Sequence, residues 1–204
     1  RDLHLSLRRQ RQMCIRDRHN QESLLPQPNL RREIATLFLN LRTSPTSQQT
    51  ESKNTNKFRE HYLDQIEKSI KENGGVVHKL NDYLILSLFK SRFEENVELK
   101  AIKTALRIKD ILETYNKNYE RKITFGIGIH AGTIISEEEN AIKYSKIANI
   151  TSTARKLSNI AENDIIVSNS VLLKTGSSIR VKEVNYIDID GKKERIYTIL
   201  GKIT

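Results

Sequence analysis

Apolar positions recur with two different periods along residues 31–201, which predicts alternating strands and helices. The run at 33–42 is apolar between charged ends and predicts a strand. Residues 58–70 then carry apolar side chains four positions apart, which is the spacing of a helix with one buried face. Asn73-Gly74 follows as a helix stop, since glycine readily adopts the left-handed conformation that ends helices.

A hairpin is predicted directly after that stop. Two short apolar runs, 76–80 and 84–89, flank Asn81-Asp82, which are residue types that hydrogen-bond to their own backbone in tight turns. The second run is almost wholly apolar, which favours a central strand covered on both faces. A carboxylate at the hairpin tip suits a metal ligand, but this stretch alone favours the interpretation of Asp82 as an ordinary turn residue.

The next predicted strand carries glycines on one of its two faces. After a helix over 94–117, residues 122–130 alternate strictly, and Gly126 and Gly128 lie on the face opposite the isoleucines. Repeated glycines on one face indicate close approach by another backbone or by a ligand. Ala131-Gly132 is interpreted as the turn that ends this strand.

The remaining pattern completes a mixed α/β (α+β) fold. In chain order it predicts a helix, a strand, a short helix and two further strands, over 147–161, 164–167, 168–173, 179–184 and 194–200. The order from the first strand is therefore βαββαβ, followed by an extra C-terminal helix and strands. We interpret this order as a ferredoxin-like core, in which helices pack on one face of a sheet that contains antiparallel strands.

Composition predicts one domain in this chain. Its 204 residues, 37% hydrophobic and 29% charged, are typical of a soluble globular protein. Residues 31–204 are assigned to the domain, 21–30 to a linker, and 1–20 to a disordered or extraneous basic tail. Because no apolar run reaches the roughly 18–20 residues that span a bilayer, we expect membrane attachment only through segments outside this chain. With one cysteine and no signal-peptide stretch, the sequence favours the cytoplasm, or the cytoplasmic side of a membrane protein.

Charge and simple motifs exclude several other classes of protein. The net charge of +10 includes six arginines within residues 1–20, and the rest mixes lysine with glutamate and holds few aromatics, so we predict no nucleic-acid partner. The glycines at 126, 128 and 132 lack the Rossmann spacing. No Cys/His cluster supports zinc, and no nucleophile motif supports acyl transfer. His78 and His130 are single histidines in or beside strands and are interpreted as structural rather than as metal ligands.

Five segments in chain order resemble one known family. They are the first strand (31–42), the Asn-Gly-Gly-Val-Val…Asn-Asp hairpin (73–82), the strand Phe-Gly-Ile-Gly-Ile-His-Ala-Gly (125–132), the helix at 144–157 and the closing stretch at 192–201. In order and spacing they resemble the class III adenylate/guanylate cyclase catalytic domain, over about residues 31–201. The resemblance implies cyclisation of ATP or GTP to a 3′,5′-cyclic nucleotide with release of pyrophosphate.

The resemblance also implies a metal site and a partner. In this family two aspartates from two strands hold two Mg²⁺ ions, which activate the 3′-hydroxyl and neutralise the phosphates. A second subunit supplies base-reading residues, a ribose-positioning asparagine and a transition-state arginine. The expected assembly is therefore a homodimer, or a heterodimer with another cyclase domain, with sites at the subunit interface.

This sequence departs from the family at the metal and phosphate positions. The first metal aspartate aligns with Asn40, a neutral ligand, while the second aligns with Asp82 and is retained. The phosphate loop aligns with Thr43, Ser44 and Pro45, where proline has no N–H to offer a phosphate and threonine lacks the freedom of glycine.

The positions implied to serve the second subunit's site are also substituted. The base-reading pair aligns with His78 and Ser145, which matches neither ATP nor GTP preference well. The ribose asparagine aligns with Ser152. The transition-state arginine aligns with Lys156, which keeps the charge but loses the planar two-pronged grip on phosphate.

Two functional hypotheses follow. The first is a cyclase-homology domain of cyclic-nucleotide signalling that is inactive or very weak, needs no metal, and serves as a dimerising, nucleotide-binding regulatory module. The alternative is an active cyclase, in which Lys156 replaces the arginine while Asn40 and Asp82 hold one Mg²⁺ or Mn²⁺ ion. The substitutions favour the first hypothesis, because several electrostatic contributions are lost together and each 1.4 kcal/mol of barrier slows a reaction about tenfold.

Overall fold

The protein is built on one seven-stranded sheet. The computed structural model describes residues 30–43, 53–91, 96–119, 122–136, 144–189 and 191–202. The strands are β1 (Leu30–Thr43), β2 (Val76–Lys79), β3 (Leu84–Lys90), β4 (Ile123–Ser136), β5 (Asp164–Ser168), β6 (Ile179–Ile189) and β7 (Lys192–Lys202). The helices are α2 (Lys53–Glu72), α3 (Val97–Asn118), α4 (Tyr144–Ile160) and α5 (Asn169–Thr175), with a 3-10 turn, η3 (Gly176–Ser178).

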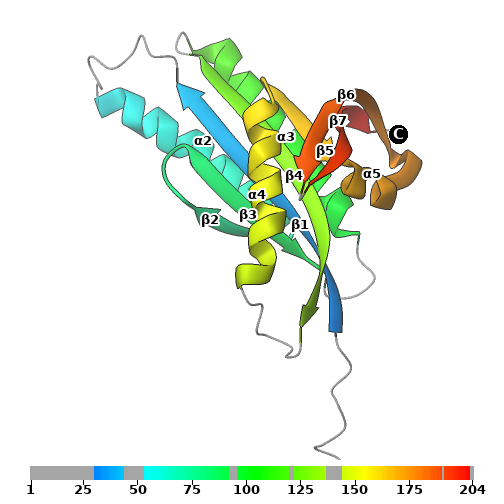
Figure 1. The fold of residues 1–204 in the computed structure, drawn as a ribbon. Coiled ribbons are helices and arrows are strands. Elements are labelled where there is room, and N and C mark those ends of the chain that lie inside the picture. The colour runs from blue at the N-terminus through cyan, green and yellow to red at the C-terminus, as the bar shows by residue number, and fades with distance from the viewer. Residues whose placement is uncertain are drawn as a thin grey trace, which may run out of the picture.

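The predicted ferredoxin-like core is confirmed by the sheet order β2-β3-β1-β4-β5-β7-β6. β1 lies between β3 and β4 and is antiparallel to both, and β2 pairs with β3 at the sheet edge. β5 runs parallel to β4 after a crossover through α4. α2 and α3 lie on one side of the sheet and α4 crosses the other (Figure 1).

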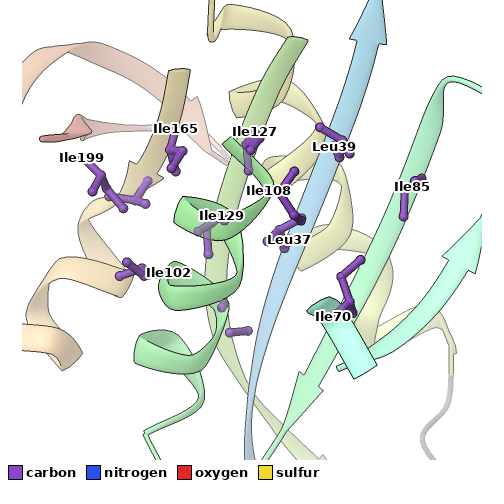
Figure 2. Packing of buried hydrophobic residues seen from close by; sticks show 14 of the residues in the cluster. Leu37, Leu39, Ile70, Ile85, Ile102, Ile108, Ile127, Ile129, Ile165 and Ile199 are labelled. Atoms are coloured by element: carbon purple, nitrogen blue, oxygen red, sulfur yellow. The ribbon is translucent and has the colours of Figure 1, made fainter. Parts of the chain in front are cut away.

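The main hydrophobic core lies between the sheet and the helices α2 and α3. Leu37, Leu39, Ile127 and Ile129 of the two central strands are fully buried on this face (Figure 2). They pack with the apolar stripes of the two helices, namely Ile66, Ile70, Ala101, Ile102, Ala105, Ile108 and Leu112. Burial of each large side chain stabilises the fold by about 1.5–3 kcal/mol relative to exposure. The four-residue spacing in the sequence therefore corresponds to real buried faces.

α4 packs so closely on the opposite face that two positions of β4 have no room for a side chain. A methyl group at Gly128 would lie 2.1 Å from the carbonyl oxygen of Ala154, and one at Gly126 would lie 2.0 Å from that of Ser158. The close approach predicted from these glycines is thus made by a helix backbone.

The hairpin prediction is confirmed in detail. The side-chain oxygen of Asn81 accepts the backbone N–H groups of both Tyr83 and Leu84 at 2.8 Å, which closes the turn between β2 and β3. An asparagine side chain can replace a backbone carbonyl in this way, so the turn needs no glycine.

Two predicted boundaries are wrong. β4 continues through Ala131-Gly132, the predicted turn, because both residues remain paired with Ala35 and Ile34 of β1. β6 continues past its predicted end at 184 to Ile189, because β7 pairs with it along that length. Residues 1–29, which include the predicted tail and most of the linker, lie outside the described residues. None of the described helices is long and apolar enough to cross a membrane.

Candidate functional site

The two predicted metal-binding positions lie at the same end of the sheet. Asn40, near the end of β1, pairs with Leu84 of β3, two residues beyond Asp82. The backbone N–H of Leu41 donates to the carbonyl oxygen of Tyr83 at 2.8 Å, which holds the hairpin tip against β1. Asn40 is half-buried and Asp82 is exposed. The fold therefore brings the backbones of both positions to one edge.

The side chain of Asn40 is engaged with α4. Its Nδ2 donates to Oδ1 of Asn159 at 2.8 Å. Two residues along the same face of β1, Nη2 of Arg42 donates to the carbonyl oxygens of Ser158 at 2.8 Å and Asn159 at 3.0 Å. These carbonyls end α4 and have no partner within the helix, and a cation there also interacts favourably with the helix dipole. Side chains of β1 thus fasten the last turn of α4 to the sheet.

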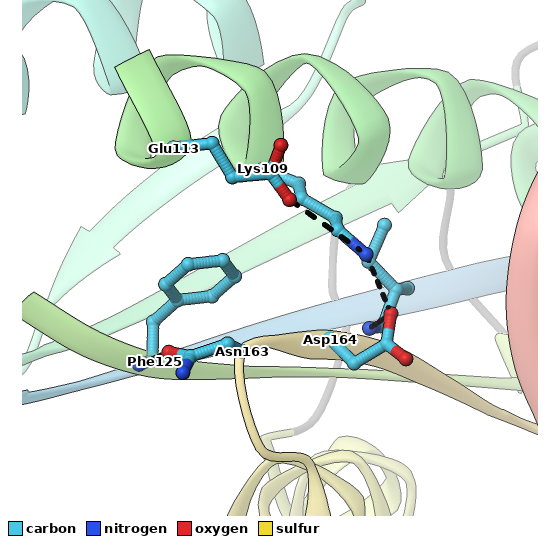
Figure 3. Close-up of polar contacts among 6 residues, drawn as sticks. Lys109, Glu113, Phe125, Asn163 and Asp164 are labelled. Atoms are coloured by element: carbon cyan, nitrogen blue, oxygen red, sulfur yellow. Dashed lines mark hydrogen bonds and ion pairs between the residues drawn. The ribbon is translucent and has the colours of Figure 1, made fainter. Parts of the chain in front are cut away.

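The same end of the sheet is braced on its other face (Figure 3). Nζ of Lys109 in α3 lies 2.8 Å from Oδ1 of Asp164, at the start of β5, and 4.0 Å from Oε1 of Glu113. Asn163, with a left-handed φ of 52°, donates its N–H to the carbonyl oxygen of Phe125 at 2.7 Å. Its side-chain oxygen accepts the N–H of Phe125 at 3.0 Å. These bonds fix the loop that follows α4, and so help to position its last turn.

The predicted base-reading position His78 lies on β2, opposite Leu86 of β3, and is half-buried. Its neighbour Lys79 points to the other face of the sheet, where its ammonium group pairs with Glu67 of α2. The hydrogen bond between them raises the pKa of Lys79 and lowers the pKa of Glu67. Since strand side chains alternate, His78 faces the side of the sheet that α4 crosses, as Asn40 does.

The predicted catalytic positions Ser152 and Lys156 are exposed and lie one turn apart on α4. They lie outside the buried stripe of the helix, which includes Ala154 and Leu157. The structure therefore presents them on an outward surface.

Three further predicted positions are only partly described. Ser145 lies in the first turn of α4, and Thr43 ends β1 opposite Ile123. The structure describes the backbone of these two residues but not their side chains. Ser44, at the predicted phosphate loop, lies outside the described residues. Arg42 and Asn159 were not predicted, although Arg42 shares the strand face of Asn40. No sequence pattern links Asn159 to a strand more than a hundred positions away.

Comparison with protein-family models matches residues 33–201 to the adenylate and guanylate cyclase catalytic domain. The chain belongs to this family. No curated protein sequence matches the chain significantly. The family match covers every described strand except the start of β1 and the end of β7, so the cyclase family accounts for nearly the whole fold.

Solved cyclase structures share this fold at low sequence identity. The adenylyl cyclase CyaB from P. aeruginosa is 14% identical, with a TM-score of 0.68, over 84% of this chain and 95% of that chain. The guanylate cyclase domain of RhGC from Catenaria anguillulae, in complex with GTP, is 14% identical, with a TM-score of 0.69, over 85% of this chain and 100% of that chain. An adenylate/guanylate cyclase/hydrolase from Silicibacter pomeroyi is 21% identical, with a TM-score of 0.62, over 83% of this chain and 97% of that chain.

Cyclases of this family generally use a divalent metal, and the donor groups at the two predicted metal-binding positions, Asn40 and Asp82, do not fit one. Mg²⁺ is held mainly by carboxylate oxygens and water. Asn40 offers a neutral amide whose nitrogen donates to Asn159, and Arg42 adds positive charge to the same strand face. Asp82 is the one carboxylate at the two positions, and no three His, Cys, Asp or Glu side chains gather anywhere in the described parts of the chain.

Proposed function

We propose that this cyclase-family domain is a regulatory module that pairs with a second cyclase domain and binds a nucleotide, while turning over little or none. The observation that carries the proposal is the environment of Asn40. Where the family has a metal carboxylate, this chain has an amide hydrogen-bonded to Asn159. Loss of one metal carboxylate removes an electrostatic contribution of several kcal/mol, and each 1.4 kcal/mol slows the reaction about tenfold.

The intact core supports a role that depends on binding rather than on turnover. The apolar positions of both sheet faces are buried, and the close contact of α4 with β4 is kept. A domain that keeps its complete fold but has a substituted metal position is suited to bind other molecules at its surface. Its nucleotide would be ATP or GTP, the substrates that the family name implies.

A second cyclase domain, either another copy or a different chain, is the proposed partner. Among the structural neighbours, a guanylyl cyclase domain from Blastocladiella emersonii is described as a non-canonical dimer in one structure and as monomeric in another, and the RhGC domain holds GTP. In this chain Val76, Leu80 and Tyr83 expose 48%, 53% and 39% of their surface around the β2–β3 hairpin. Apolar side chains gathered on one exposed hairpin suit a protein interface.

The proposal is tested by separating binding from turnover on the same chain. Fluorescent ATP and GTP analogues should bind in polarisation titrations, light scattering should report a dimer, and product assays should find no cyclic nucleotide. Product that depends on Asp82 would instead establish the alternative, an active cyclase with a tolerated asparagine. Absence of both binding and self-association would remove the regulatory role as well.

A further inference from the structure

The last turn of α4 is fastened to β1 by three side chains, Asn40, Arg42 and Asn159, which we call the position-40 clamp. We propose that position 40 binds the end of α4 in place of a divalent cation, and that Asn159 is the positioning residue that makes it do so. The proposal rests on the proposed function, because it assumes that Asn40 and Asp82 do not together hold a metal ion. It goes further by naming what has taken the metal's place.

The clamp lies at the edge of the fold, where Asn159 is exposed and Asn40 and Arg42 are half-buried. Arg42 is half-buried, and its Nη2 would lie only 3.1 Å from a methyl group built on Gly126, directly beneath the helix end. Its carbonyl oxygen accepts a hydrogen bond from Oγ1 of Thr124 at 3.1 Å. The guanidinium therefore lies next to both β4 and the terminal carbonyls of α4.

The chemistry of an amide makes Asn159 able to hold a carboxylate as well as an asparagine. An amide carries an acceptor oxygen and a donor nitrogen, and rotation by half a turn exchanges them. In Asn40→Asp, Asn159 can therefore turn and donate its N–H to the new carboxylate. A hydrogen bond to an ionised acceptor is stronger than one between neutral groups. Because a bound cation withdraws charge from the carboxylate, the bond from Asn159 stabilises the metal-free carboxylate more than the metal-bound one, so restoring the carboxylate alone leaves the clamp opposed to metal binding.

The inference is tested by titrating the full chain with Mn²⁺ alone and following free Mn²⁺ by electron paramagnetic resonance. The double variant Asn40→Asp/Asn159→Ala should bind Mn²⁺ with a dissociation constant about fivefold to tenfold lower than that of Asn40→Asp. A change of this size corresponds to the net free energy of about one hydrogen bond. The matched control is Asn40→Asp/Asn149→Ala, because Asn149 is an exposed asparagine of the same helix. Equal affinities in Asn40→Asp and Asn40→Asp/Asn159→Ala, or no measurable binding by either, would overturn the proposal.

A thermal cycle tests the clamp without any metal. Asn40→Ala and Asn159→Ala should each lower the Tm by about 2 °C, and the double variant should lower it by about the same amount as either one. Additive shifts would show that the two side chains do not interact and would overturn the clamp. Turnover by the unmodified chain would overturn the proposed function. The thermal cycle would still show whether Asn40 and Asn159 interact, so a failure of the proposed function can be distinguished from a failure of the clamp.

Discussion

At the residue scale, one nitrogen in place of one oxygen changes what β1 can bind at its end. An aspartate at position 40 would be an acceptor only, whereas Asn40 donates to Asn159 and so joins the helix end to the strand. Arg42 adds two charged hydrogen bonds to the same helix end. The resemblance to the family predicts a substitution at position 40 but not its consequence, since the consequence depends on a partner distant in the chain.

A second residue gives a stability prediction that depends on pH. Glu98, in the first turn of α3, is 2% exposed, and its burial raises the pKa of its carboxyl above the ordinary value of 4.5. The nearby Glu33 carboxylate raises this pKa further, while the backbone N–H of Glu98 and the Lys174 ammonium oppose the shift. The folded state therefore holds its proton to higher pH than the unfolded state, so stability falls as pH rises from about 4.5 through the folded pKa.

Glu98→Gln should therefore raise the Tm at pH 7.5, with a gain that shrinks as the pH falls and vanishes only well below pH 4.5, where the carboxyl is protonated in both states. The measurement is a series of thermal melts across this pH range. Glu162→Gln, at an exposed position, serves as the control. A gain of the same size at every pH would mean that the Glu98 charge is not the cause.

At the element scale, the contact of α4 with β4 depends on the absence of a side chain. Gly128→Ala should lower the free energy of unfolding by about 3 kcal/mol, because its methyl group would meet the backbone of α4 at Ala154 and Ser158. Urea unfolding measures the loss. Gly132→Ala is the matched control, since its methyl group would meet only the flexible side chain of Ile150. Equal losses at the two glycines would argue against a rigid helix backbone over β4.

Helices and strands whose apolar residues recur at a regular spacing could be predicted from the sequence, whereas the ends of these elements were harder to predict. The alternation over 122–130 and the turn chemistry of Asn81 both correspond to what the chain does. Ala131-Gly132 was interpreted as a turn because glycine commonly ends strands. Here Gly132 stays paired with Ile34 and leaves room for Ile150, so long-range pairing overrides the local signal.

At the scale of the whole molecule, the hairpin that carries Asp82 also carries exposed apolar surface. Leu80→Glu should raise the dissociation constant of the proposed dimer at least tenfold, because it places a charge in an apolar contact. Light scattering over a dilution series measures this. Leu173→Glu is the control, since Leu173 is 75% exposed on α5, away from the hairpin. Equal weakening by both variants would mean that the hairpin is not the interface.

The family could be recognised from the sequence because the strand with Gly126 and Gly128, and the apolar positions that hold the fold, resemble those of the family. The contacts made by the side chains of the candidate site could be predicted less well. Asn40 was identified as a neutral substitute, but its bond to Asn159 joins residues separated by most of the chain. Ser152 and Lys156 are exposed, and the role predicted for them requires a partner that a single sequence does not contain.

Whether this domain turns over a nucleotide is decided by an assay of cyclic-nucleotide formation with excess Mn²⁺ and either ATP or GTP. The unmodified chain is assayed beside Asn40→Asp and Asp82→Ala. We predict no product above a protein-free blank from any of the three, since Asn40→Asp restores one carboxylate but leaves the predicted phosphate-loop, ribose and transition-state positions, Thr43, Ser152 and Lys156, substituted. Product from the unmodified chain that disappears in Asp82→Ala would contradict the account and make this domain a working cyclase.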